Sequence, residues 1–224
     1  MIANPERLEK AIDYSFNNKG LLDVALTHRS VGRVNNERLE FLGDAILGMF
    51  IADVLFEKFS EASEGELSRM RSSLVRGESL TELAQEISLG DYLNLGQGEL
   101  KSGGFRRASI LADAFEALIG AIYLDSSVER CREFVMAHFA EKLASVTPSD
   151  TLKDPKTQLQ ELLQSRRMPL PVYEVISTSG EAHNQVFTVE CRIDDNEPVQ
   201  SSGTSRRKAE QSAAAELLKV FSNE

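Results

Sequence analysis

The sequence predicts two domains: an all-α domain and, after it, a small α+β domain with the order α-β-β-β-α. Apolar residues recur with a helical period through residues 8–143. Residues 145–150 (SVTPSD) are small and polar and include a proline, which is typical of a linker. After them, short runs alternate apolar and polar residues, as strands do. We therefore expect domains at residues 1–146 and 152–222, joined by a linker at 147–151.

The composition is that of a globular chain, since 42% of its 224 residues are hydrophobic and 27% are charged. No run reaches the ~18 uncharged apolar residues of a membrane span, and Met1 is not followed by a signal core. We therefore expect a cytoplasmic protein without a membrane partner or a small organic cofactor. Cys131 and Cys191 are far apart and the histidines are scattered, which excludes a zinc site with recognisable ligand spacing. Any metal ion must be held by oxygen.

The first helix that carries informative acids is predicted over residues 37–56. At about 100° per residue, Glu37, Glu40, Asp44 and Gly48 fall on one narrow stripe of this helix. Nearly all of the remaining circumference is apolar. A helix that is apolar almost all round is expected in a core.

A second helix of this kind is predicted over residues 110–124, where Asp113 and Glu116 lie one turn apart and Gly120 continues their stripe. Ionised carboxylates are costly to bury unless a cation or a hydrogen-bond donor compensates them. Two such helices therefore predict a shared site. Gly48 and Gly120 are expected to let the two helices approach closely.

Two simpler explanations of these acids stay open: a solvated helix surface, or a buried ion pair with Arg29 or Arg38. A cluster of four or more carboxylates instead suits Mg²⁺ or Mn²⁺, which commonly act on phosphate esters. Di-iron bundles also bury helical acids, but they need Glu-x-x-His pairs, and no histidine here has a glutamate three residues before it. The pattern therefore favours phosphodiester chemistry.

The second domain is expected to begin with a helix, because Asp154-Pro155 combines an N-cap residue with a first-turn proline. This helix should run to about Arg167, before two prolines end it. Three antiparallel strands and an alanine-rich helix should follow. They are expected at residues 172–178, 185–193, 198–202 and 205–221.

One run resembles the signature of the ribonuclease III family: residues 35–45, NNERLEFLGDA. Further blocks resemble that family in the same order, namely LTHRS at 26–30, EGELSRMR at 64–71, residues 98–107 and LADAFEAL at 111–118. The C-terminal domain resembles a double-stranded-RNA-binding domain and ends in RKAEQ at 207–211. The resemblance covers essentially the whole chain. It implies the bacterial two-domain architecture, an endonuclease domain followed by an RNA-binding domain.

The resemblance implies that a homodimer hydrolyses double-stranded RNA with Mg²⁺, for which Mn²⁺ substitutes. Metal ions would activate water and steady the scissile phosphate, leaving 5′-phosphate and 3′-hydroxyl ends with a short 3′ overhang. Implied substrates are ribosomal-RNA precursors and some messenger and transfer RNA transcripts. The implied metal ligands are Glu40, Asp44, Asp113 and Glu116, and the implied catalytic acids are Asp44, Glu116, Glu37 and Glu64. Glu64 rests on the resemblance alone.

Phe41 matches the aromatic residue that plugs into the partner subunit in this family. Its alternative role is that of an ordinary core phenylalanine. The loop with Lys101, Arg106 and Arg107 could contact phosphates, or it could be a flexible surface loop.

Duplex RNA is recognised through its shape, its 2′-hydroxyls and its phosphates. Basic residues at the start of the last helix add charge to its positive end, which favours phosphates. The resemblance implies that the first helix of this domain faces one minor groove and that a loop with His183 enters the next. The expected RNA-binding residues are Thr157, Gln160, Glu161, His183, Arg206, Arg207 and Lys208.

The net charge argues against a generally basic RNA-binding surface. The whole chain carries a net charge of -10, and residues 150–224 carry 9 Lys and Arg against 12 Asp and Glu, a net charge of -3. We therefore expect weak and salt-sensitive RNA binding.

One alternative function is that of a scaffold that binds duplex RNA without cutting it, which would be expected to lack some of the acids. Another is a DNA nuclease, which would not explain a C-terminal domain suited to A-form geometry.

Overall fold

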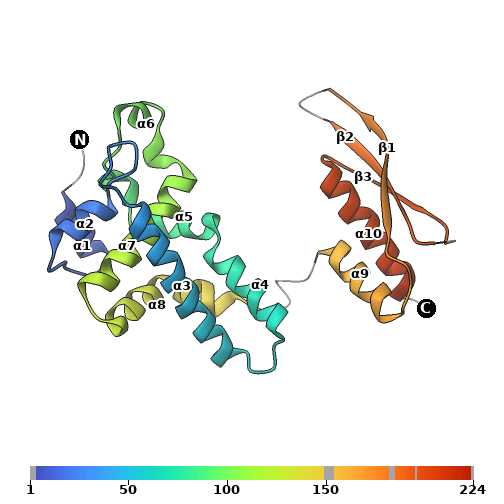
Figure 1. Cartoon of the computed structure of the whole chain (residues 1–224), viewed down its shortest axis with the longest axis horizontal. Helices are drawn as coiled ribbons and strands as arrows, with labels where there is room; N and C mark the ends of the chain where they lie inside the picture. The colour runs from blue at the N-terminus through green and yellow to red at the C-terminus, as the bar shows by residue number, and fades with distance from the viewer. Residues whose placement is uncertain (1–3, 149–153, 182–184, 195, 223–224) are drawn as a thin grey trace. The chain divides into compact units, whose positions relative to one another are not determined.

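The computed structural model describes residues 4–148, 154–181, 185–194 and 196–222. The chain forms two compact units, residues 1–151 and 152–224 (Figure 1). The predicted fold class is confirmed, since a helical unit precedes an α-β-β-β-α unit. Part of the predicted linker at 147–151 lies outside the described residues, so its limits stay a prediction.

The described part of the first unit is helical and includes the 3₁₀ turns η1 and η2. Its elements are α1 (Pro5–Ala11), α2 (Lys19–Ala25), α3 (Glu37–Lys58), α4 (Glu64–Val75), α5 (Gly77–Glu86), η1 (Leu89–Tyr92), α6 (Gln97–Lys101), η2 (Gly104–Arg106), α7 (Ala108–Asp125) and α8 (Val128–Ser145). The polar turn before α4 ends in a capping box, in which Ser63 and Glu66 bind each other's backbone N–H groups. Helix α4 therefore begins directly after its N-cap residue, Ser63.

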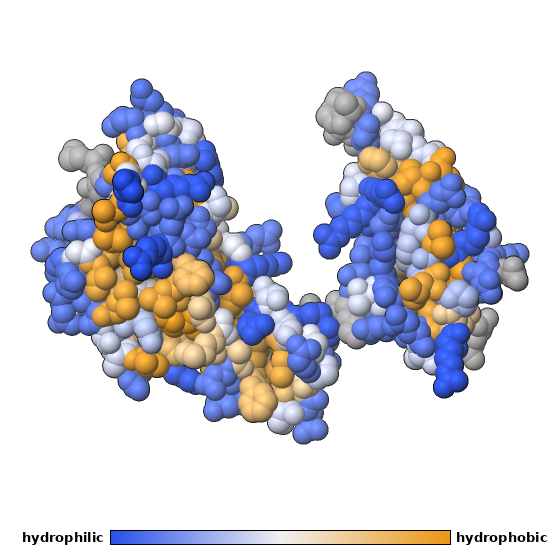
Figure 2. All heavy atoms as spheres, viewed as in Figure 1, coloured by the Kyte–Doolittle hydropathy of each residue, from blue (hydrophilic) through white to orange (hydrophobic). Residues whose placement is uncertain are grey.

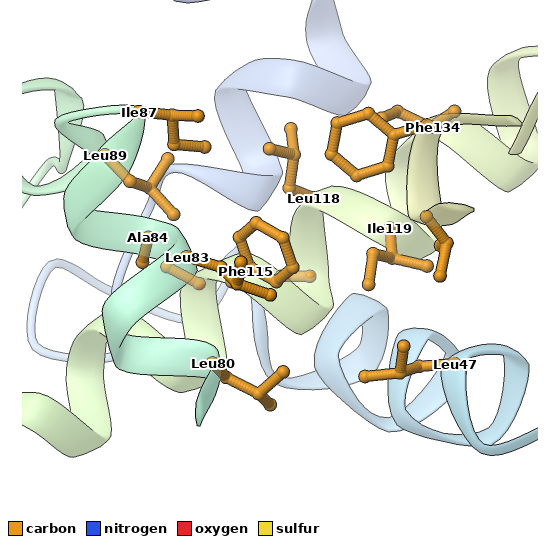
Figure 3. Packing of buried hydrophobic residues seen from close by; sticks show 14 of the residues in the cluster. Leu47, Leu80, Leu83, Ala84, Ile87, Leu89, Phe115, Leu118, Ile119 and Phe134 are labelled. Atoms are coloured by element: carbon orange, nitrogen blue, oxygen red, sulfur yellow. The ribbon is translucent and has the colours of Figure 1, made fainter. Parts of the chain in front are cut away.

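Helix α7 is the centre of this unit, because apolar side chains cover almost all of its surface. It packs most extensively against α3 and next against α5. Figure 3 shows Phe115 of α7 beside Leu83 of α5 and Leu118 of α7 beside Phe134 of α8, and Leu47 of α3 belongs to the same buried cluster. Burying α7 on all sides fixes the direction in which its few polar side chains can point.

The second unit consists of α9 (Pro155–Ser165), β1 (Val172–Ser179), β2 (Val186–Arg192), β3 (Val199–Gly203) and α10 (Arg206–Ser222). Its strands pair antiparallel in the order β1-β2-β3, with β2 in the middle. Both helices pack against one another, and α10 also packs against β2 and β3. Leu159, Cys191 and Leu217 belong to the small core between the helices and the sheet.

The start of α9 is as predicted, because the Asp154 side chain accepts a hydrogen bond from the Thr157 N–H (3.1 Å). The helix ends at Ser165, two residues before the predicted end. Arg167 adopts a left-handed conformation with φ of 58°, which cannot continue a helix.

Candidate functional site

The site is built where α3 and α7 touch, and two glycines let their backbones meet. A Cβ atom on Gly43 would lie 1.8 Å from the Glu116 carbonyl oxygen, and one on Gly120 would lie 2.3 Å from the Leu39 carbonyl oxygen. Neither position has room for a side chain. The close approach expected at Gly120 is confirmed, but the one expected at Gly48 is wrong, since nothing lies within 4 Å of its Cβ position.

Three carboxylates meet beside this contact, Glu40 from α3 and Asp113 and Glu116 from α7. One oxygen of each lies within 4.8 Å of the other two, and all three residues are partly buried. The two acid stripes predicted from the sequence thus come together in space. Because three like charges at this separation repel one another, the cluster calls for a positive charge.

The pKa values of these carboxyl groups are raised, because burial, and for Glu40 and Glu116 also the neighbouring negative charges, make them harder to ionise. Burial, together with the charges of Asp44 and Glu40, raises the pKa of Glu116 to about 8. Burial raises the pKa of Glu40, and Asp113 and Glu37 add to the effect. A bound divalent cation would reverse these shifts by favouring the ionised forms.

Burial also raises the pKa of Asp113, whereas His28 and Arg29 act in the opposite direction. A cavity of about 260 Å³ lies beside the cluster and is lined by His28, Arg29, Asn36, Glu37, Glu40, Glu99, Arg107, Ser109, Ile110 and Asp113. The cavity therefore holds both acidic and hydrogen-bond-donating groups. Such a mixture suits a phosphate group together with a metal ion.

The remaining predicted acids lie outside this trio. Asp44 and Glu37 are exposed on α3, although each is close enough to raise the pKa of Glu40. Arg29 lies 3.6 Å from Glu37, and both side chains are more than half exposed, so this ion pair contributes little. Glu64 begins α4, where its carboxylate accepts a hydrogen bond from Ser68 Oγ (2.8 Å).

The prediction that α3 is buried all round is wrong. Phe41 is 79% exposed, Met49 52% and Phe56 72%, so the ordinary core role for Phe41 is excluded. Figure 2 shows apolar side chains gathered over the face along which α3 runs in Figure 1. Beside Phe41 lies a largely apolar cavity of about 900 Å³, whose lining includes Val34 and Leu124. An exposed apolar face of this kind is typical of a protein interface.

The basic loop predicted to contact phosphates is partly neutralised. Arg107 Nη1 lies 2.9 Å from Glu99 Oε2, and the Arg106 guanidinium packs over the Phe105 ring. Lys101 is exposed at the end of α6.

In the second unit, Arg206, Arg207 and Lys208 are exposed in the first turn of α10. The Ser205 hydroxyl accepts a hydrogen bond from the Lys208 N–H (3.2 Å) and so caps this end. Glu210 binds Arg206 Nε at 2.9 Å.

Glu210 also binds Lys156 Nζ of α9, at 2.8 Å, so one acid connects the two helices. The residues Thr157, Gln160 and Glu161 are exposed on α9. His183 lies outside the described residues.

Sequence reasoning missed two features of the site. Gly43 was not expected to be a contact point, because the sequence of one helix does not determine where another helix crosses it. His28 was noticed only within a motif, and its place in the cavity comes from the loop that carries it.

In the part of the chain that the structure describes, no helix is long and apolar enough to cross a membrane.

Comparison with known proteins finds two families along the chain. The Ribonuclease-III-like family matches residues 18–143, and the double-stranded RNA binding motif matches residues 155–220. A curated protein named Ribonuclease 3 from Pseudoalteromonas translucida is 57% identical over 224 residues, which is all of both chains. Another of that name from Shewanella oneidensis is 58% identical over 221 residues, 98% of each chain.

Among solved structures, the nuclease domain of ribonuclease III from Campylobacter jejuni is similar, with a TM-score of 0.61 and 42% identity. It aligns with 62% of this chain and 97% of its own, and its structure shows flexibility in a region involved in dimer formation.

Proposed function

Since this chain belongs to the bacterial two-domain ribonuclease III family and is an endonuclease for double-stranded RNA, we propose that it cuts with divalent metal ions bound by the α3–α7 carboxylates. The observation that carries this proposal is the trio of Glu40, Asp113 and Glu116 within 4.8 Å. Three partly buried acids fit a hard cation better than an ion pair, because Arg29 beside them is exposed and Arg107 is paired with Glu99.

The proposed metal is Mg²⁺, with Mn²⁺ as a substitute, because both favour carboxylate oxygens. Glu40, Asp113 and Glu116 would hold it, with Asp44 as the fourth ligand acid. When bound, the metal supplies charge neutralisation at the scissile phosphate and activation of water. The raised pKa of Glu116 supports this role, because the carboxyl group is costly to ionise without a cation.

The chain's own residues would orient the substrate around this centre. We propose Glu37 as an acid at the cavity rim, where it lines the same cavity as Glu40 and Asp113. Glu64, at the start of α4, is proposed as a further catalytic acid on family resemblance. The products would carry 5′-phosphate and 3′-hydroxyl ends with a short 3′ overhang.

The proposed active form is a homodimer, formed through the exposed apolar face of α3. A twofold interface is self-complementary, so the protruding Phe41 of one subunit could fill the cavity beside Phe41 in the other. Phe41→Ala should therefore shift the protein toward monomer, which sedimentation velocity would measure. His138→Ala, in a separate groove lined by Ala137 and Glu141, is the control and should leave the dimer intact.

We propose that residues 1–146 form the catalytic domain and residues 152–222 the RNA-binding domain, with a linker at 147–151. The proposed RNA contacts in the second unit are Thr157, Gln160, Glu161, His183, Arg206, Arg207 and Lys208. Ribosomal-RNA precursors and some messenger and transfer RNA transcripts are the proposed substrates. We place the protein in the cytoplasm, because its buried Cys131 and Cys191 are free thiols.

The test is cleavage of a long RNA duplex in Mg²⁺ by the wild type and by Glu116→Gln. The variant keeps the shape of the side chain but removes its charge, so we expect it to lose at least about 10³-fold in rate. Binding of the duplex, measured in Ca²⁺, should not change. The control is Glu141→Gln, an acid of the separate groove. A wild type that binds but never cuts would leave only the scaffold function.

A further inference from the structure

His28 lies in the loop between α2 and α3, and backbone hydrogen bonds fasten this loop on both sides. The His28 N–H donates to the Asn94 carbonyl (3.0 Å), and Thr27 pairs with Asn94 as a parallel bridge. On the other side, the Asn36 N–H donates to the Thr27 carbonyl (2.9 Å), directly before α3 begins. The position of His28 relative to the acid-bearing helix is therefore set by the backbone.

The hydrogen bonds of Ser30 decide which ring nitrogen of His28 carries the proton. The Ser30 N–H lies 3.2 Å from Nδ1, and a backbone N–H can only donate, so Nδ1 accepts. Ser30 Oγ also lies 2.8 Å from Nδ1 and itself accepts the Gly96 N–H (2.8 Å). The hydroxyl proton is then free to point at Nδ1. In the neutral imidazole the proton must therefore sit on Nε2.

The Nε2–H group is the polar group of His28 that the loop leaves unused. Among the described residues it has no hydrogen-bond partner, whereas His28 lines the cavity that also contains Glu40 and Asp113. Of the two arginines of this cavity, Arg107 is paired with Glu99 at 2.9 Å, whereas Arg29 makes only a weak, exposed pair with Glu37. His28 thus contributes a hydrogen-bond donor whose orientation is fixed and which is available to a ligand.

We propose that His28 Nε2–H donates a hydrogen bond to a non-bridging oxygen of the scissile phosphate and so positions it against the carboxylate cluster. This inference rests on the proposed function of that cluster. An oriented N–H donor suits this place because the phosphate that it would bind is anionic and needs donors as well as metal ions. A donor that is already oriented also stabilises charge developing on the phosphate at no cost of reorganisation.

Two substitutions separate the role of Nδ1, which Ser30 binds, from the proposed role of Nε2. In His28→Asn, the amide oxygen can replace Nδ1 and accept the Ser30 N–H, but nothing replaces the Nε2 donor. In His28→Gln, the longer amide can return an N–H group to the place of Nε2. His138→Asn is the matched control, because this histidine bonds the Phe134 carbonyl through Nδ1 and lies in the separate groove.

The experiment measures single-turnover cleavage of a short RNA duplex in Mg²⁺ by the full chain. We expect His28→Asn to slow cleavage about 10²-fold, the usual loss for one oriented donor, and His28→Gln to recover most of that loss. Duplex binding in Ca²⁺, the half-saturating Mg²⁺ concentration and the thermal midpoint should stay at wild-type values. His138→Asn should cut at the wild-type rate.

A phosphorothioate at the scissile position gives a second measurement, namely the loss of rate caused by sulfur. This loss should not depend on His28 if the residue only supports the structure. Sulfur is a weaker acceptor than oxygen, so one diastereomer should slow the wild type, and this additional loss should shrink in His28→Asn. Wild-type cleavage by His28→Asn would overturn the proposal, as would a slow His28→Asn whose Mg²⁺ requirement or thermal midpoint has changed. Normal cleavage by Glu116→Gln would instead overturn the proposed function itself.

Discussion

The acidic side chains of the two units have opposite surroundings: like charges in the first unit and basic partners in the second. In the first unit, Glu40, Asp113 and Glu116 gather within 4.8 Å, and burial raises the pKa of each. In the second unit, Glu210 lies between Lys156 and Arg206, and these partners lower the pKa of its carboxyl group. One unit concentrates like charges, and the other neutralises its charges locally.

This difference shows where each unit needs a ligand. The acid cluster is unfavourable until a cation arrives, so its geometry must be imposed by the packing of α3 on α7. In the second unit, Glu210 is already paired without RNA, and the exposed Arg207 and Lys208 of α10 can offer charge to a phosphate. Rigid packing should therefore matter more for the first site, and individual surface charges for the second.

Among the variants that test this comparison, the largest effect on stability is expected from forcing α3 and α7 apart. In Gly43→Ala, the new methyl group would lie 1.8 Å from the Glu116 carbonyl oxygen, so the backbone must shift. We expect the free energy of unfolding to fall by about 3 kcal/mol and cleavage to fall at least about 10²-fold. Denaturant unfolding and cleavage in Mg²⁺ would measure both.

Gly48→Ala on the same helix is the matched control, because nothing lies within 4 Å of its Cβ position. Alanine favours helix over glycine by about 1 kcal/mol, so this variant should be as stable as the wild type or more stable. Equal behaviour of the two variants would mean that the glycine contact does not hold the cluster together.

A smaller effect is expected on stability as a function of pH. The pKa of Glu116 in the folded protein is about 8, well above its ordinary value. Between these two values the folded state binds more protons than the unfolded state, so without metal the free energy of unfolding should fall as pH rises. Glu116→Gln should remove most of this fall, since Glu40 and Asp113 keep a smaller part, and should be more stable than the wild type at pH about 8 by about 1–3 kcal/mol.

Denaturant unfolding in EDTA at several pH values between about 5 and 8 would measure this difference. Added Mg²⁺ should stabilise the wild type more than the variant, because only the wild type regains a favourable partner for the charge. If the free energies of unfolding of the wild type and of Glu116→Gln change with pH in the same way, then ionising Glu116 in the folded protein does not destabilise it.

The sequence predicted that Glu40, Asp113 and Glu116 would come together, and the reason is geometric. Helical periodicity is rigid, so the spacing of Asp113 and Glu116 already placed them on one face, and the apolar surroundings indicated which acids were costly. The same periodicity could not separate a core position from an interface position. Phe41 therefore seemed equally suited to both, and only its 79% exposure in the folded unit distinguishes them.

Sequence reasoning placed Gly120 at a contact between helices, but it missed other contacts between elements in both units. The i, i+4 spacing of Arg206 and Glu210 is visible in the sequence, but the third partner, Lys156, comes from another helix. In the first unit, the two backbones meet at Gly43 rather than Gly48, because helix crossing depends on the packing of every side chain around α7. Local periodicity predicts faces, and tertiary packing decides which residues on a face touch.

A weaker effect is expected from the outer charges of α10. Arg207→Ala combined with Lys208→Ala should reduce the slope of log affinity against log salt by about 2, or about 1 for each phosphate that is no longer neutralised. Stability should hardly change, because both side chains are exposed. Lys219→Ala, near the other end of α10 and paired with Glu216, is the control. An unchanged slope in the double variant would show that the phosphates bind elsewhere.

The smallest expected effect tests whether the second unit neutralises its own charges. Glu210→Gln removes the acid between Lys156 and Arg206 and should destabilise the protein by about 1 kcal/mol near neutral pH. Because the pKa of Glu210 is lowered in the folded state, its contribution is present above the ordinary pKa and is lost as pH falls through the lowered value. The wild type and the variant should therefore become equally stable in acid.

Glu216→Gln is the comparison for this last variant, because Glu216 is 52% exposed and Glu210 only 12%. Denaturant unfolding at neutral and acid pH would measure both. A cost for Glu210→Gln that exceeds the cost for Glu216→Gln, and that disappears in acid, would show that the ion pairs connecting α9 and α10 stabilise the unit. If both variants lose the same stability, the ion pairs of Glu210 contribute no more than an exposed surface pair. The difference between the two units would then depend only on the acid cluster of the first unit.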